Sequence, residues 1–151
     1  MLALLRRRAA GAAAAQHRRA ACSPPAAGAN DVIGFCYPGV PRSVGAARRD
    51  IADALEGCPV TDDAVWLLSE IATNAVLHSK SSGPDGIFVV DLAMRTGQFV
   101  AISVTDQGAI GDVPHDYHSR TKLVITLADL FWMDVDDQGR TTGFRLQWTQ
   151  A

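Results

Sequence analysis

The sequence predicts an α/β (α+β) two-layer sandwich, in which helices pack on one face of a mixed, mostly antiparallel sheet. Three patterns support this prediction. Apolar residues recur at helical spacing over residues 43–55 and 61–77. Two apolar runs at 87–94 and 99–105 are joined by a short link, so they should pair as an antiparallel hairpin. A last helical stretch at 123–131 precedes a final hairpin, with strands at 132–135 and 142–148 around a turn at 136–140.

The chain is long enough for one domain, with 151 residues and 48% apolar content. No apolar run reaches the roughly 18 residues that suggest a membrane span, so no membrane association is expected. Cys22, Cys36 and Cys58 are odd in number and widely spaced, which fits neither a disulfide framework nor a metal site. This cysteine usage is typical of a reducing compartment, and we expect a cytoplasmic protein.

Residues 1–30 are expected to be a disordered Ala/Arg-rich extension of a folded domain at 31–151. The extension contains five arginines and no acid, whereas the rest contains nine Lys and Arg, sixteen Asp and Glu, and a formal charge of −7. An acidic body argues against nucleic-acid binding, which normally needs a basic patch. For residues 1–30, the favoured interpretation is a disordered extension or an upstream start codon chosen in error. Three alternatives fit this segment less well: a secretory signal, a lipoprotein cleavage site at Cys22 and a transit peptide.

The first half of the domain is predicted to contain one strand followed by two helices. Residues 32–37 alternate large side chains as a strand does, and Pro41 suits the first position of the helix that continues through 43–55. Thr61 is expected to cap the second helix, because a threonine hydroxyl accepts hydrogen bonds from the first free backbone N–H groups.

The second helix has a polar row beside its apolar stripe. Glu70, Asn74 and His78 are spaced four residues apart, so they lie one helical turn above each other. A carboxamide oxygen can ligate a hard cation such as Mg²⁺, and a carboxylate can accept a proton or orient a water. From spacing alone, a solvated polar face on an ordinary amphipathic helix is the favoured interpretation.

An acidic and glycine-rich loop follows the strand at 99–105, with the sequence Asp106-Gln107-Gly108-Ala109-Ile110-Gly111. An acid at a strand end followed by glycines permits a tight turn and a close approach of the backbone to a ligand. A surface loop is the alternative, since an Asp-x-Gly pattern is common.

These two motifs together resemble a known family. Residues 70–78, Glu-Ile-Ala-Thr-Asn-Ala-Val-Leu-His, resemble the N-box of the GHKL ATPases, and the loop at 106–111 is similar to their G1 box. The resemblance runs from about residue 35 to 148 and is greatest to the single-domain anti-sigma-factor serine/threonine kinases. It implies the Bergerat fold of that family, which is an α/β two-layer sandwich.

The resemblance implies an ATP site built on both motifs. In the family pattern, Asp106 accepts a hydrogen bond from the exocyclic amine of adenine, and Gly108 lets the base lie flat against the backbone. Gly111 completes the same motif, although the residue before it, Ile110, is often smaller in relatives.

The family pattern also assigns roles to the polar row. Asn74 would hold the Mg²⁺ that bridges the triphosphate, and Glu70 would be the general base. His78 would contact the pocket wall or a phosphate, and an interaction with the helix dipole is an equal alternative.

The segment that closes over ATP in relatives departs from the family pattern. Relatives have a Gly-Arg-Gly-Leu type run whose backbone N–H groups hold the phosphates, and this chain has no glycine between Gly111 and Gly139. Arg120 and Lys122 could supply charge to the phosphates, and Thr121 could cap a helix there; solvated surface charge is the alternative. The turn at 139–141 resembles the closing turn of the family and is interpreted as structural.

The resemblance implies two functions from different classes. The first is an ATP- and Mg²⁺-dependent regulator that phosphorylates a serine on a STAS-type anti-anti-sigma protein and otherwise sequesters a sigma factor. The second is a non-catalytic binding module of the same fold that only docks onto such partners. Whether the protein forms a homodimer is left open.

Overall fold

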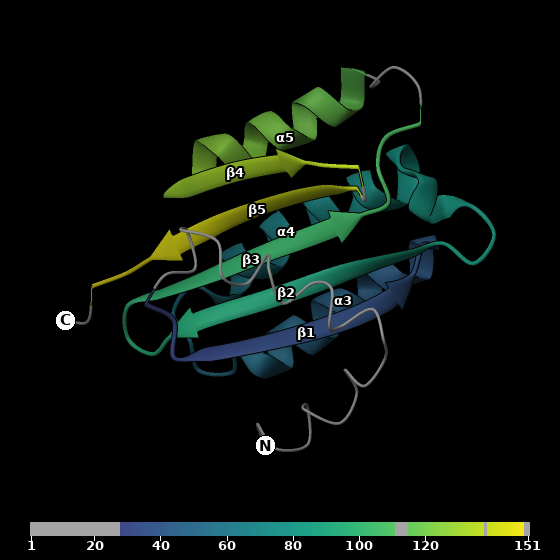
Figure 1. Cartoon of the computed structure of the whole chain (residues 1–151). Coiled ribbons are helices and arrows are strands. Elements are labelled where there is room, and N and C mark those ends of the chain that lie inside the picture. The colour runs from purple at the N-terminus through teal and green to yellow at the C-terminus, as the bar shows by residue number, and fades with distance from the viewer. Residues whose placement is uncertain (1–27, 111–114, 138, 150–151) are drawn as a thin grey trace.

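The computed structural model describes residues 28–110, 115–137 and 139–149. Five strands form one sheet in the order β1-β2-β3-β5-β4 (Figure 1). Their bounds are β1 Asp31–Pro38, β2 Ile87–Arg95, β3 Phe99–Asp106, β4 Leu130–Val135 and β5 Arg140–Gln147. All four strand pairings are antiparallel, so the described sheet is not mixed.

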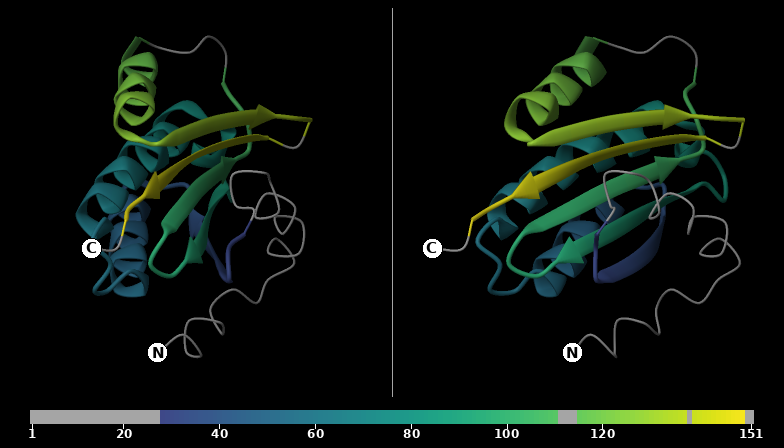
Figure 2. Two further views of the ribbon diagram at one scale, coloured as in Figure 1. Left: turned by 90° about the vertical axis from the view of Figure 1, so that its left-hand side faces the viewer. Right: turned by 60° about the vertical axis from the view of Figure 1, so that its left-hand side comes forward.

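Helices α3 (Pro41–Ala54) and α4 (Thr61–His78) cover one face of this sheet (Figure 2). The third helix, α5 (His115–Leu127), lies above β4 and packs against α4 (Figure 1). The α/β two-layer sandwich predicted from the sequence is therefore confirmed. None of the described helices is long and apolar enough to cross a bilayer.

The core lies between α4 and the helix-facing side of β2 and β3. Side chains alternate between the two faces of a strand, and the set that faces the helices is fully apolar along most of each strand. The buried cluster includes, from α4 and the two strands, Leu68, Ile71, Ala72, Ala75, Phe88, Val90, Leu92, Ile102 and Val104. The predicted apolar stripe of α4 is thus the surface that joins the two layers.

Two local predictions about helix ends are wrong. The Thr61 hydroxyl does not cap α4, because it donates to the backbone oxygens of Leu55 and Cys58 in the preceding turn, at 2.7 and 2.8 Å. The late helix begins at His115 and ends at Leu127, whereas residues 123–131 were expected. The expected range extended too far because Phe131, which continues the apolar spacing, belongs to β4.

The last hairpin is longer than expected at the start of its second strand. Residues 136–140 were predicted to form its turn, but Arg140 is the first residue of β5. It pairs directly with Val135 of β4 on one side and with Asp106 of β3 on the other. This register places an arginine opposite the acid of the predicted adenine-binding motif.

Candidate functional site

Two of the elements that contain predicted site residues, α4 and the loop after β3, are joined at one end of the sheet. The segment after α4 contacts the loop after β3: the backbone N–H of Lys80 donates to the oxygen of Gly108 at 2.8 Å, and Ser79 forms a β-bridge with Ala109. The end of the α4 polar row is therefore tied to the Asp106 loop, as the two motifs require.

Asn74 is the most deeply placed member of the polar row. Its side chain is only 4% exposed, and its Oδ1 atom is buried without a hydrogen-bond partner among the described residues. A buried amide oxygen without a donor is costly, and it fits a site that a cation or a bound donor would complete. His78 is the last residue of α4 and is partly buried.

Glu70 lies two turns before the end of the helix and contacts α5. Its Oε2 atom is 3.4 Å from Nη1 of Arg120, so the candidate general base is paired with a candidate phosphate contact. Lys122 is exposed on the same helix, and Thr121 is buried within it. Because α5 begins six residues earlier, Thr121 cannot cap the helix as predicted.

Asp106 is buried at the end of β3, on the side of the sheet that faces the helices. Its register partner in β5 is Arg140, and both side chains are almost inaccessible, at 4% and 6% exposure. The Oδ2 atom accepts from Nε and Nη2 of Arg140 at 3.1 and 2.8 Å. The Oδ1 atom accepts from the backbone N–H of Gly108 at 2.8 Å. Both carboxylate oxygens therefore already have donors from within the chain.

The charge state of Asp106 reflects opposing influences. Burial raises the pKa of its carboxyl group above the ordinary value, because a low-dielectric environment disfavours the ion. The charge and hydrogen bonds of Arg140, and the N–H of Gly108, act in the opposite direction. The arginine is thus the main group that opposes the rise in the Asp106 pKa caused by burial.

Glycines shape the backbone around this pair. Gly108 has a φ of +96°, in the region that side chains rarely adopt. A Cβ atom on Gly139 would lie 2.0 Å from the backbone oxygen of Asp106, so only glycine permits β5 to enter at this position. Gly111, which completes the predicted motif, lies outside the described residues.

The residues present fit a bound Mg²⁺-nucleotide only in part. The buried oxygen of Asn74 is a suitable ligand for Mg²⁺, which prefers oxygen donors. The Oδ2 atom of Asp106 can receive the amine of adenine only if Arg140 moves away from it. The sequence analysis did not identify Arg140 as a site residue, because it assigned this residue to a turn. The signal for Arg140 is that it lies opposite an acid, and this becomes visible only once the register of β3 and β5 is known.

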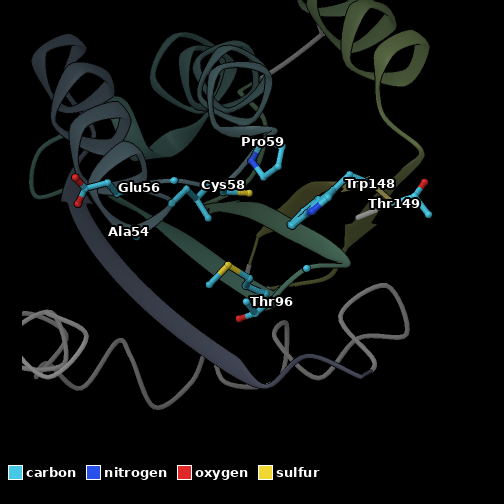
Figure 3. A pocket seen from close by; sticks show the side chains of 11 residues that line it. Ala54, Glu56, Cys58, Pro59, Thr96, Trp148 and Thr149 are labelled. Carbon is cyan, nitrogen blue, oxygen red and sulfur yellow. The ribbon is translucent and has the colours of Figure 1, made fainter. Parts of the chain in front are cut away.

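A cavity of about 640 Å³ lies at the opposite end of the sheet (Figure 3). It is formed by the turn between α3 and α4, the β2–β3 turn and the residues after β5. Its lining includes Leu55, Cys58, Pro59, Met94, Thr96 and Trp148. None of the predicted site residues lines it, so this cavity is separate from the Asp106 site.

Comparison with known structures supports the architecture. The chain is similar to a crystal structure of the RsbU and RsbW domains of Rv1364c from Mycobacterium tuberculosis, with 19% identity and a TM-score of 0.62. The match covers 78% of this chain and 32% of that one, so the present chain spans about a third of the matched structure. No protein-family model and no curated protein matches the sequence. At this identity, the likeness establishes a shared fold.

Proposed function

We propose that this chain is a regulatory protein of the GHKL group that resembles an anti-sigma-factor serine/threonine kinase and binds ATP with Mg²⁺. The observation on which this proposal depends is the meeting of the two motifs. The Asp106 loop is hydrogen-bonded to Lys80, two residues after the end of the α4 polar row, and Asn74 contributes a buried oxygen that lacks a donor among the described residues. The fold shared with a structure that contains an RsbW domain supports the same proposal.

The proposed partners are a sigma factor and a STAS-type anti-anti-sigma protein. In this proposal Asn74 holds Mg²⁺, and Glu70 would accept a proton from the attacking hydroxyl after release from Arg120. Arg120 of α5 contacts Glu70 of this row, Lys122 is exposed on the same helix, and His78 ends the row. Mg²⁺ would neutralise phosphate charge when bound. Recognition of the adenine base would require Arg140 to move away from Oδ2 of Asp106.

Calorimetric titration with Mg-ATP tests the proposal. We expect saturable binding that Asn74→Ala and Asp106→Asn each weaken by at least about tenfold, which corresponds to roughly 1.4 kcal/mol. Glu56→Gln is the matched control, because Glu56 is exposed at the other end of the sheet and lines the separate cavity. Binding that is equal in all four proteins would contradict the assignment of the site.

The second candidate is a non-catalytic module that binds its protein partner without nucleotide. Two ion pairs favour it: Arg140 occupies Asp106, and Arg120 contacts Glu70. The absence of glycine between Gly111 and Gly139 favours it as well, since a backbone phosphate cradle needs glycine. A folded protein that captures a STAS-type partner but gives no heat with Mg-ATP would select this candidate over the first.

A further inference from the structure

We propose that the Arg140 side chain occupies the Asp106 carboxylate that would recognise adenine. A nucleotide then binds only when the Arg140 side chain moves away from Asp106. The inference rests on the proposed function and adds a regulatory residue to it. It concerns a position that the family pattern leaves as part of a structural turn.

Arginine and adenine offer the same kind of group to a carboxylate. A carboxylate only accepts hydrogen bonds, and the exocyclic amine of adenine offers N–H groups to it, as a guanidinium does. Here the guanidinium already donates twice to Oδ2 of Asp106, and Gly108 donates to Oδ1. These three donors fill both acceptor sites of Oδ2 and one of Oδ1, and Asp106 is only 4% exposed, so an incoming adenine amine reaches Oδ2 only by replacing the arginine.

The energetics of exchange favour the arginine. A carboxylate strengthens its hydrogen bonds to either donor, but the guanidinium adds a full positive charge and two N–H groups, which the neutral amine of adenine does not match. Both partners of the ion pair are buried, so little water competes for either charge. Apparent nucleotide affinity then falls in proportion to the fraction of molecules in which Asp106 is open.

The backbone fixes the arginine in this position. Asp106 and Arg140 are direct partners in the β3–β5 register, and the adjoining Gly139 approaches the Asp106 backbone too closely for any other residue. A side-chain hydrogen bond at 2.9 Å between Thr105 and Thr141 links the next pair of the ladder. Rotation of the Arg140 side chain is therefore the movement that opens the carboxylate without breaking the sheet.

Adenosine and Mg-ATP titrations at about pH 8 test the inference, with adenosine reporting base recognition apart from phosphate charge. Arg140→Ala should bind both ligands at least about tenfold more tightly than the unaltered protein. Arg145→Gln is the matched control, since Arg145 lies on the same strand but stacks on the Phe99 ring at 3.7 Å, and it should leave affinity unchanged. Asp106→Asn in the Arg140→Ala background should abolish the gain.

Arg140→Lys covers the case in which the alanine variant does not fold. A lysine keeps the positive charge but lacks the two-point contact of a guanidinium, so its affinity should lie above that of the unaltered protein. If the unaltered protein binds with dependence on Asp106 and neither Arg140 variant binds more tightly, the inference is wrong and the proposed function stands. If no folded variant binds either ligand, the proposed function is wrong and the inference falls with it.

Discussion

Two buried carboxylates in the same sheet have opposite surroundings. Asp106, at the end of β3, faces the helices and is held by the guanidinium of Arg140. Asp91, in the middle of β2, faces the other side and lies between Gly34 and Ser103 of the neighbouring strands. Both are nearly inaccessible, at 4% and 8% exposure, but the Oδ2 atom of Asp91 has no hydrogen-bond partner among the described residues.

The difference shows what a partner does for a buried acid. Burial raises the pKa of the Asp91 carboxyl from its ordinary 3.8 to about 7, and no opposing charge acts on it. For Asp106, Arg140 opposes the effect of burial on the pKa. The pKa of Asp106 therefore depends on both burial and its arginine partner, whereas the pKa of Asp91 depends on burial alone. Substitutions that remove the charge should lower the free energy of unfolding at Asp106 and raise it at Asp91.

Breaking the Asp106–Arg140 pair should give the largest effect. Arg140→Met and Asp106→Leu should each lower the free energy of unfolding by roughly 3–5 kcal/mol, because each leaves one charge buried and unpaired. The double variant should regain most of this loss. A double-mutant cycle in urea measures the coupling, and strictly additive losses would show that the pair is not what stabilises this end of the sheet.

Removing the charge of Asp91 should stabilise the protein, with a strong pH dependence. Between about pH 4 and pH 7 the native carboxyl keeps a proton that the unfolded chain has lost, so the stability of the native protein falls as the pH rises. Asp91→Asn should remove this fall and gain up to about 4 kcal/mol above pH 7, and almost nothing near pH 4. Urea unfolding at both pH values measures it; an equal effect at both would contradict the assignment.

Crowding the space beside Asp91 should have a moderate effect. A Cβ atom at Gly34 would lie 2.9 Å from Oδ1 of Asp91, so Gly34→Ala should destabilise by about 1–3 kcal/mol. The same substitution in an Asp91→Ala background should cost much less, because the clashing oxygen is gone. Thermal unfolding of the four proteins separates the contact from any intrinsic effect of alanine in a strand.

The smallest effect should come from the partly exposed pair of the site. Arg120 and Glu70 are 33% and 18% exposed and 3.4 Å apart, so Arg120→Ala should change stability by no more than about 1 kcal/mol. The change should shrink further at high salt. A loss as large as that for Arg140 would mean that α5 is held by this single contact.

The sequence was sufficient to predict the elements whose periodicity is set by burial. Helix α4 and the β2–β3 hairpin were predicted to within a residue or two, because the apolar side chains on one face of each pack into the same core. Helix α5 was misplaced because, among its described side chains, Val124 is the only fully buried apolar one, so burial leaves little periodic signal. Thr61 was misassigned because a hydroxyl can serve the turn before a helix as well as the helix itself.

The sequence predicted candidate site residues but not the contacts between them. Placing Asp106 near the end of α4 needed only the order of the elements, and the link between Lys80 and Gly108 agrees with it. Identifying Arg140 as the partner of Asp106 needed the strand register, which depends on contacts between segments far apart in the chain.

The strand order also has a consequence for how the molecule acquires its structure. Two hairpins, β2–β3 and β4–β5, form between neighbours in the chain, but they meet along β3 and β5, where partners such as Asp106 and Arg140 are 34 positions apart. Closing a loop of that length costs entropy before the contacts can compensate for it. The salt bridge can therefore form only after the hairpins dock, so it belongs to the late, slow part of folding and should contribute more to the unfolding rate than to the folding rate.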